Sequence, residues 1–325
     1  MNVIRQSPVV NLATLAVIIA AVAVRSHAAP YEAETAAETA SFLGSKLSAW
    51  QMQHHIAAAV MAAVVWFAAG WVIGLVVRVR ELYFVRTTIT IPIYGIVACG
   101  IFCPHDSLTA AVASLLFAIA VRSYFESFRD GYGFSPIFFG SLCLGALPLF
   151  YAPAVTLLML MPLAVMLFKR SAREAIVAVA GLVFAPLAAC YASWGAGGGF
   201  TEPVIQTAYA LTAVSGYRFF GALHAVAGVM TGMLLTLVLS AVFIGSASIH
   251  SMNTRARYIT FYNMCAFIIA LSTLALPSST PTAFGLIAVP TAMTIPSMLV
   301  QIKPEAANAI FCGLSLLFIL HLFVG

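Results

Sequence analysis

The most constraining feature of this sequence is a series of eleven apolar runs separated by short polar segments. They lie at residues 9–24, 56–77, 87–102, 108–121, 136–150, 153–168, 175–191, 220–243, 258–276, 284–302 and 306–323. Only 8% of the residues are charged and 62% are hydrophobic, whereas a soluble domain carries roughly 25% charged residues. Because so few polar side chains cannot cover a water-exposed surface, the runs predict membrane-spanning helices whose backbone groups pair internally.

The expected fold is an all-α polytopic transmembrane bundle of about eleven spans, which forms one integral-membrane domain over residues 1–325. No segment between the runs exceeds about 31 residues, which is too short for a folded soluble domain. This excludes a fused nucleotide-binding domain or soluble enzyme module. The runs 136–150 and 153–168, joined only by Tyr151 and Ala152, predict a tight hairpin. Both are shorter than the roughly 20 residues of an upright span, so a re-entrant half-span stays open for either.

The basic residues predict the orientation of the chain. With the N-terminus inside and eleven crossings, twelve Lys and Arg residues fall on the inner side. The outer side receives only Arg25, Lys46 and Arg218. Cytoplasmic loops of membrane proteins are enriched in Lys and Arg, so this split predicts that the N-terminus is inside and Gly325 is outside. The same rule explains the net charge of +5 without nucleic-acid binding.

The first run also has a second interpretation. Arg5, the apolar stretch 12–24 and the following Ser26-His27-Ala28 resemble a signal peptide with a small-x-small cleavage site. Cleavage would leave ten spans and would not move the other loops.

Two outer segments are long enough to carry structure of their own. The first, 25–55, begins with three glutamates and continues with Phe42, Leu47 and Trp50 at helical spacing. This pattern predicts an interfacial amphipathic helix that leads into the second span.

The second outer segment, 192–219, is nearly uncharged and opens with a glycine-rich run after Trp194. Thr201 is expected to cap a helix whose first turn contains Glu202 and Pro203. We expect this helix to lie in the membrane interface or to dip into the membrane.

The stretch from Arg86 to Trp194 resembles a known family. An arginine-threonine start to the third span is followed by the charged sequence 122–130, the proline hairpin 145–153 and the charged sequence 169–174. This pattern is similar to a family of multi-pass inner-membrane proteins of Bacteroidota that is known only as a domain of unknown function. The resemblance covers about a third of the chain. It implies a bacterial inner membrane and a role in the cell envelope, and it brings no assigned activity.

Histidines gather on one side of the predicted topology, because six of the seven fall on the outer side. Imidazoles and carboxylates at one membrane face can bind a metal or exchange protons with a substrate. The histidine spacing fits no metal-binding motif, so we expect a site without a metal or cofactor. Its candidate catalytic residues are His54, His105, Glu202, Arg218, His224 and His321. The alternative is that these polar side chains are simply tolerated at the membrane interface.

Opposite charges lie three or four residues apart at the inner ends of several spans, which places them on one helix face. In the simpler interpretation they anchor the helix ends at lipid headgroups. In the second they include an inner arginine cluster that binds a phosphate or a membrane-protein partner. This cluster consists of Arg122, Arg129, Arg170 and Arg173.

The tenth run is interrupted by Pro290 and Pro296, with Thr291 and Thr294 beside them. Prolines free backbone carbonyls that hydroxyl groups can satisfy, so this run predicts either a broken helix lining a polar path or an ordinary kinked helix. No Asp, Glu, Lys or Arg lies in the middle of any run, which weighs against a proton-coupled carrier.

Small residues and cysteines complete the pattern. The motifs Gly70-x3-Gly74 and Gly228-x3-Gly232 are expected to serve close helix packing inside the bundle. The six cysteines show no CxxC pair and are expected to be buried free thiols. They are Cys99, Cys103, Cys143, Cys190, Cys265 and Cys312.

Three functions fit these features, and they leave open whether the protein is an enzyme. The first is a role in cell-envelope biogenesis, in which the protein binds or processes a lipid-linked, amphiphilic substrate at the outer face. The second is transport of a small solute or lipid through the region of the tenth run. The third is a non-catalytic membrane scaffold that uses the inner arginine cluster. Membrane lipids are the expected contacts in all three, and we favour the first.

Overall fold

The structure is a computed structural model that describes residues 4, 6–28, 41–80, 87–100, 107–128, 133–215, 225–248 and 254–324. Over these residues it is all-helical, as predicted, and each of the eleven apolar runs holds a helix. The helices of the bundle are α1 (Pro8–Ala28), α4 (His55–Arg80), α5 (Thr90–Gly100), α6 (Ser107–Ser127), α7 (Phe134–Phe150), η2 (Ala152–Met159), α8 (Leu160–Leu167), α9 (Ala172–Gly195), α11 (Ala225–Ser248), α12 (Thr254–Ser272), α13 (Ala283–Leu299) and α14 (Pro304–Val324). The short helices α3 (Phe42–Gln53), α10 (Glu202–Thr212) and η4 (Thr273–Ala275) lie between them.

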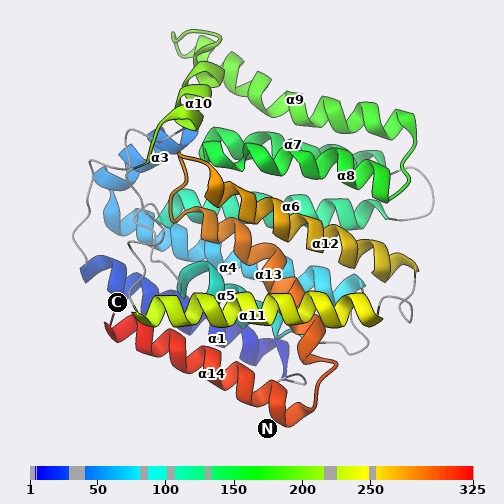
Figure 1. Ribbon diagram of the computed structural model, residues 1–325. Coiled ribbons are helices and arrows are strands. Elements are labelled where there is room, and N and C mark those ends of the chain that lie inside the picture. Colours follow the sequence, from blue (N-terminus) through cyan, green and yellow to red (C-terminus); the bar gives the residue numbers. More distant parts are fainter. Residues whose placement is uncertain are drawn as a thin grey trace.

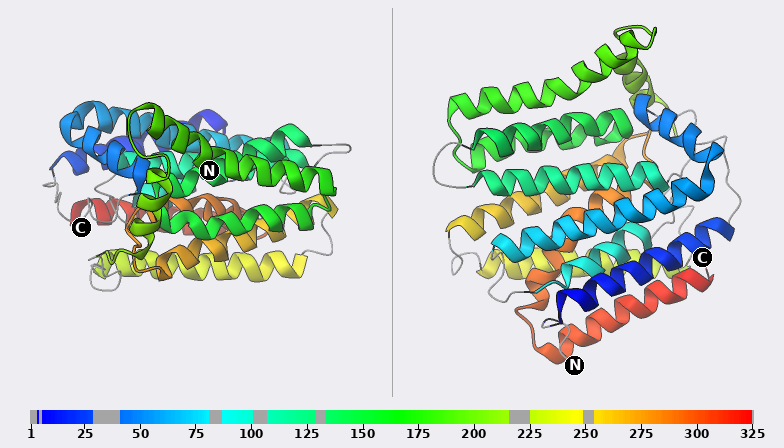
Figure 2. Two further views of the ribbon diagram at one scale, coloured as in Figure 1. Left: turned by 90° about the horizontal axis from the view of Figure 1, so that it is seen from above. Right: turned by 180° about the vertical axis from the view of Figure 1, so that it is seen from behind.

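The long helices run side by side across a broad bundle (Figure 1). One edge is formed by α9 and the opposite edge by α14, as Figure 1 and the right view of Figure 2 show. Six helices are long and apolar enough to cross a membrane, namely α4, α6, α9, α11, α12 and α14. Five shorter apolar helices accompany them, namely α1, α5, α7, the continuous pair η2–α8, and α13. The protein is therefore a multi-pass membrane protein by the length and composition of its helices.

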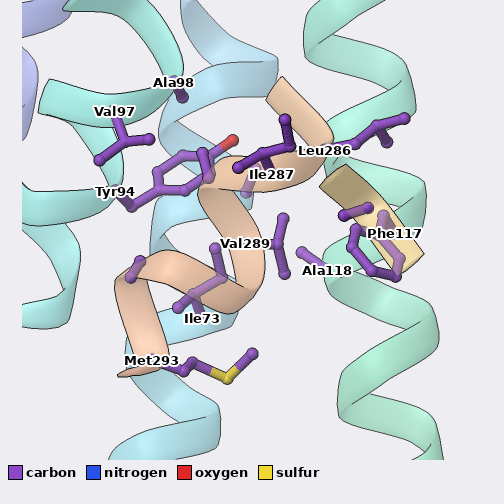
Figure 3. Close-up of a cluster of buried hydrophobic side chains, with 14 of the residues drawn as sticks. Ile73, Tyr94, Val97, Ala98, Phe117, Ala118, Leu286, Ile287, Val289 and Met293 are labelled. Carbon is purple, nitrogen blue, oxygen red and sulfur yellow. The ribbon is translucent and has the colours of Figure 1, made fainter. Parts of the chain in front are cut away.

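The centre of the bundle is formed by α5 and α13, which are buried along nearly their whole length. Figure 3 shows where side chains from α4, α5, α6 and α13 meet, among them Ile73, Tyr94, Phe117 and Ile287. A helix that is apolar all round must be covered on every side. The sequences of α5 and α13 meet this condition, and the surrounding helices cover both.

A short chain of hydrogen bonds crosses this apolar centre. The hydroxyl of Tyr94 donates to Oγ of Ser114 over 2.6 Å, and Ser114 donates to the carbonyl oxygen of Gly285 over 2.8 Å. A Cβ on Gly285 would lie 3.0 Å from Cη2 of Trp66, so a glycine allows this close approach. The chain ties α5, α6 and α13 together and leaves none of these polar groups unpaired in hydrocarbon.

Glycines set the closest helix contacts. Gly70 and Gly74 of α4 face α5. A Cβ added at Gly74 would lie 2.7 Å from Cδ1 of Ile91 of α5. The first small-x3-small motif therefore serves internal packing, as expected. The expectation for the second motif is wrong, because added Cβ atoms at Gly228 and Gly232 would meet none of the described residues within 4 Å.

The cysteines only partly follow the prediction. Cys99, Cys143 and Cys190 are buried and form no disulfide. Cys312 is exposed on α14, and Cys265 is half-buried. Cys103 lies outside the residues that the structure describes.

The predicted hairpin is present, and a single residue, Tyr151, separates α7 from η2. The second arm begins as a 3-10 helix of eight residues and continues as α8. Pro153 lies in the first turn of η2, where its missing N–H group leaves no partner unsatisfied. The hairpin places α7 between α6 and α9 (Figure 1).

Candidate functional site

Three of the six outer candidate residues belong to the described part of the chain. They are His54, Glu202 and His321. His105, Arg218 and His224 lie outside it.

His54 is the exposed residue at which α3 ends and α4 begins. Its backbone leaves helical geometry, with φ of −131° and ψ of 52°, and its ring packs on Trp50 with centroids 5.5 Å apart. The helix predicted in segment 25–55 is therefore present as α3, a separate helix that turns at His54 into α4.

The carboxylate of Glu202 closes the turn between α9 and α10. Its Oε2 accepts hydrogen bonds from the backbone N–H of Gly199 and from Oγ of Ser193, both over 3.2 Å. Thr201 precedes the helix as expected, but its side chain makes no capping hydrogen bond. A carboxylate in the first turn is also stabilised by the positive end of the helix. Glu202 thus has a structural task in this turn.

His321 lies at the far edge of the bundle from Glu202. It is buried near the end of α14, which packs against α1, α5 and α11. Glu202 begins α10, which packs against α3, α7, η2 and α9. Figures 1 and 2 show α10 and α14 at opposite edges. The structure therefore does not bring Glu202 and His321 into one vestibule.

The helices α3 and α10 together form a cap over the ends of α7 and η2 (Figure 1). Ser41, just before α3, donates from Oγ to the carbonyl oxygen of Leu149 over 2.8 Å. A Cβ at Gly44 would overlap the carbonyl oxygen of Phe150. The buried residues of α3 are Phe42, Gly44 and Ser48. The sequence pattern pointed to Phe42 and missed the two small residues.

The end of α10 is tied to the segment that leads into α13. Ser215 donates its backbone N–H to the carbonyl oxygen of Pro277 over 2.9 Å. Tyr151 accepts a hydrogen bond from the backbone N–H of Thr280 over 3.1 Å. Burial raises the pKa of the Tyr151 phenol, so its hydroxyl stays protonated. The partners are 62 and 129 residues apart in the sequence, and no local pattern could have revealed them.

One face of α10 is apolar and points away from the bundle. Val204, Ile205 and Tyr209 are exposed on it, and Tyr209 is 72% exposed. Pro203 and Ala210 form the buried side. An apolar face of this kind on a helix outside the bundle is typical of a helix in the membrane interface.

Aromatic side chains are also exposed at the end of α9 that adjoins α10. Tyr191 and Phe200 pack edge to face with ring centroids 5.2 Å apart, and both are exposed. Trp194 is also exposed at the same helix end. Tyrosine and tryptophan are enriched where a protein meets the membrane–water interface, so α10 and the adjoining end of α9 both expose side chains typical of that interface.

Arg170 belongs to a buried junction at the opposite end of the bundle. Its Nη1 lies 3.2 Å from Oε1 of Glu174, and the two side chains are 8% and 4% exposed. Its other terminal nitrogen donates to the carbonyl oxygen of Ser127. Glu174 also accepts from the backbone N–H groups of Gly133 over 2.8 Å and Ser171 over 3.0 Å. The junction thus joins the end of α6 to the starts of α7 and α9.

The rest of the inner arginine cluster is less enclosed. Arg122 pairs with Glu126 over 3.2 Å, and these side chains are 40% and 37% exposed. Arg173 is exposed, and Arg129 lies outside the described residues. The predicted ion pairs within α6 and at the start of α9 are confirmed. Because Arg170 is held by protein groups, the cluster offers a ligand only its exposed members.

The helix with two prolines, α13, runs without a break from Ala283 to Leu299. The hydroxyls of Thr291 and Thr294 each donate to the carbonyl four residues earlier, over 2.8 Å. Pro290 and Pro296 have no N–H group, so the carbonyl four residues before each proline lacks its usual hydrogen-bond donor. The two hydroxyls donate to other carbonyls, so they do not replace the lost donors. Of the two alternatives, the continuous α13 fits the ordinary helix and not the broken one.

Asn263 of α12 is a polar contact to α13 that the sequence reasoning missed. Its Nδ2 donates to the carbonyl oxygen of Pro290 over 3.1 Å and to Oγ1 of Thr294 over 2.8 Å. A single asparagine inside an apolar run was the available signal, since polar side chains within spans are costly and often functional.

The described residues contain no group of three His, Cys, Asp or Glu side chains that could hold a metal ion. In comparisons with known proteins, no protein family, no curated protein and no solved structure matches this chain.

Proposed function

We propose that the chain crosses a bacterial inner membrane eleven times. The six long helices and the five shorter ones support this count. The 17 residues of α7 reach about 25 Å at 1.5 Å per residue. The 3-10 helix η2 rises about 2.0 Å per residue, so η2 and α8 together reach about 28 Å, close to the roughly 30 Å of a bilayer core. The shorter α5 is covered by protein, where the bilayer sets no minimum length.

In this proposal the cap faces the outside and the N-terminus is inside. The end of α6 and the starts of α9, α12 and α14 lie on the side of the bundle away from α3 and α10 (Figure 1). These helix ends carry or adjoin five basic residues, namely Arg122, Arg170, Arg173, Arg257 and Lys303. Basic residues favour the cytoplasmic side. The bacterial inner membrane and an envelope role follow from the sequence resemblance over Arg86–Trp194.

The proposed function is to bind an amphiphilic, lipid-linked substrate of cell-envelope biogenesis at the outer face. The observation that carries it is the exposed apolar face of α10, together with the exposed aromatic side chains at the adjoining end of α9. A lipid tail can lie along such a face while a polar headgroup reaches water. We propose binding rather than acid–base chemistry, because Glu202 and His321 lie at opposite edges.

The second candidate is transport of a small solute or lipid. It is favoured by the buried contact of Asn263 with Pro290 and Thr294 at the α12–α13 crossing. The scaffold function ranks below both, since Arg170 of the inner arginine cluster is engaged within the protein.

Native mass spectrometry of the purified protein tests the proposed binding. We expect a polyprenyl-linked or glycolipid species to co-purify, and we expect the double variant Ile205→Ser, Tyr209→Ser to lose it. Each buried apolar side chain contributes about 1.5–3 kcal/mol. Occupancy should therefore fall at least about tenfold.

The matched control is Val179→Ser, Val183→Ser, which places the same small polar residue on the exposed face of α9. It should keep the lipid. Equal loss in both variants, or no lipid-linked species in the unaltered protein, would contradict the proposal.

A further inference from the structure

Polar side chains gather where α5 begins, at the buried centre of the bundle. They are Asn11 of α1 and Thr87, Thr88 and Thr90, and all four are buried. Asn11 reaches across from α1, and its Nδ2 lies 2.7 Å from Oγ1 of Thr88. Oγ1 of Thr87 accepts a hydrogen bond from the backbone N–H of Ile89 over 3.3 Å. Buried polar side chains thus gather at the threonine-rich start of the third run, within an apolar core.

Two polar atoms of this group have no hydrogen-bond partner among the described residues. They are Oγ1 of Thr90, which is fully buried, and Oδ1 of Asn11, whose residue is 1% exposed. Buried polar groups are almost always paired, with protein or with a bound species. Leaving two unpaired would be costly. Their position therefore points to a ligand at the start of α5.

The electrostatics at this position favour an anion. The start of a helix is the positive end of its dipole, which favours a nearby anion. The N–H groups of Ile89 and Ile91 are already bonded and residue 92 is a proline, so side chains must supply the donors. No Asp or Glu occurs in residues 6–28 or 87–100. The Thr90 hydroxyl can donate. The Thr88 hydroxyl can donate as well as accept, so the Asn11 amide can turn over and aim its NH2 group at the same point.

The packing limits the size of the ligand. A Cβ on Gly95 of α5 would lie 2.6 Å from Cδ1 of Leu15 of α1, so the two helices are in close contact one turn away. The four polar side chains are themselves buried. We propose that a single halide ion, chloride under physiological conditions, binds between Thr90 and Asn11 at the start of α5.

Thermal unfolding of the purified full-length protein tests this site. Sodium chloride is titrated into sodium gluconate at constant sodium concentration and ionic strength. A ligand that binds only the folded state raises the melting temperature in a saturable way, and we expect this for chloride and for bromide. Thr90→Val removes one hydroxyl at nearly constant shape, and the apparent Kd for chloride should rise at least about tenfold.

Three further variants make the result decisive. Thr273→Val removes a buried hydroxyl far along the sequence in η4 and should keep the chloride response. Thr90→Ser retains the donor and should also keep it. Asn11→Asp places a negative charge at the site and should abolish the chloride response. This variant tests the proposal even if Thr90→Val does not fold. A flat chloride titration of the unaltered protein, as expected for a bound water, would overturn the proposal. An unchanged response in Thr90→Val or Asn11→Asp would do the same.

Discussion

Replacing Arg170 with methionine is expected to lower the free energy of unfolding by roughly 3–5 kcal/mol, because one partner of a buried ion pair is left alone. Glu174 would keep its hydrogen bonds to Gly133 and Ser171 but would lose its counter-charge. The carbonyl of Ser127 would lose its donor as well. Thermal or denaturant unfolding of the purified protein in detergent measures this loss of stability.

The control is Arg173→Met, three residues along the chain. Arg173 is exposed, and exposed charges contribute only about 0–1 kcal/mol. Equal stability of the two variants would show that the junction does not hold α6, α7 and α9 together. A large, selective loss at Arg170 would also mean that a functional defect of this variant reflects folding and not partner binding.

The second large effect is expected for Gly145→Ala. An added Cβ at Gly145 would overlap the carbonyl oxygen of Leu182, and one at Gly181 would lie 2.5 Å from the carbonyl oxygen of Phe138. Both contacts are to backbone, which cannot rotate away. Overpacking costs about 1–3 kcal/mol and occasionally more, and the rigid α7–α9 contact favours the upper end. The same unfolding titration measures it.

Gly232→Ala is the matched comparison, because it is the same substitution within a helix and its Cβ would meet nothing within 4 Å. Helix propensity alone predicts that it is neutral or stabilising by up to about 1 kcal/mol. If Gly145→Ala were tolerated as well as Gly232→Ala, the close approach of α7 and α9 would be incorrect.

Hydrophobicity and helical spacing were sufficient to predict the elements of this fold. All eleven apolar runs hold helices, since apolar stretches of this length have few other stable forms in a membrane. The hairpin at Tyr151 and the ion pairs Arg122–Glu126 and Arg170–Glu174 also follow from local spacing. The 3-10 geometry of η2 had no sequence signal.

The candidate site was much less predictable, because its parts are joined by long-range contacts. A prediction that His321 and Glu202 lie on one side of the membrane does not give the distance between them. In the bundle their helices, α14 and α10, lie at opposite edges. Nor does the spacing of Thr291 and Thr294 tell which carbonyls their hydroxyls reach. The contact between Asn11 and Thr88 spans 77 residues and became visible only in the folded chain.

The placement of the α3–α10 cap on the outer face is the claim on which the proposed function depends. It is tested most directly by cysteine-accessibility labelling in intact cells, in a background from which the six native cysteines have been removed. Gly195→Cys adds a thiol beside the cap where a Cβ meets nothing within 4 Å, and Arg173→Cys adds one at the exposed opposite end. We predict that a membrane-impermeant maleimide labels Gly195→Cys in intact cells and labels Arg173→Cys only after permeabilisation. The reverse pattern would contradict the account.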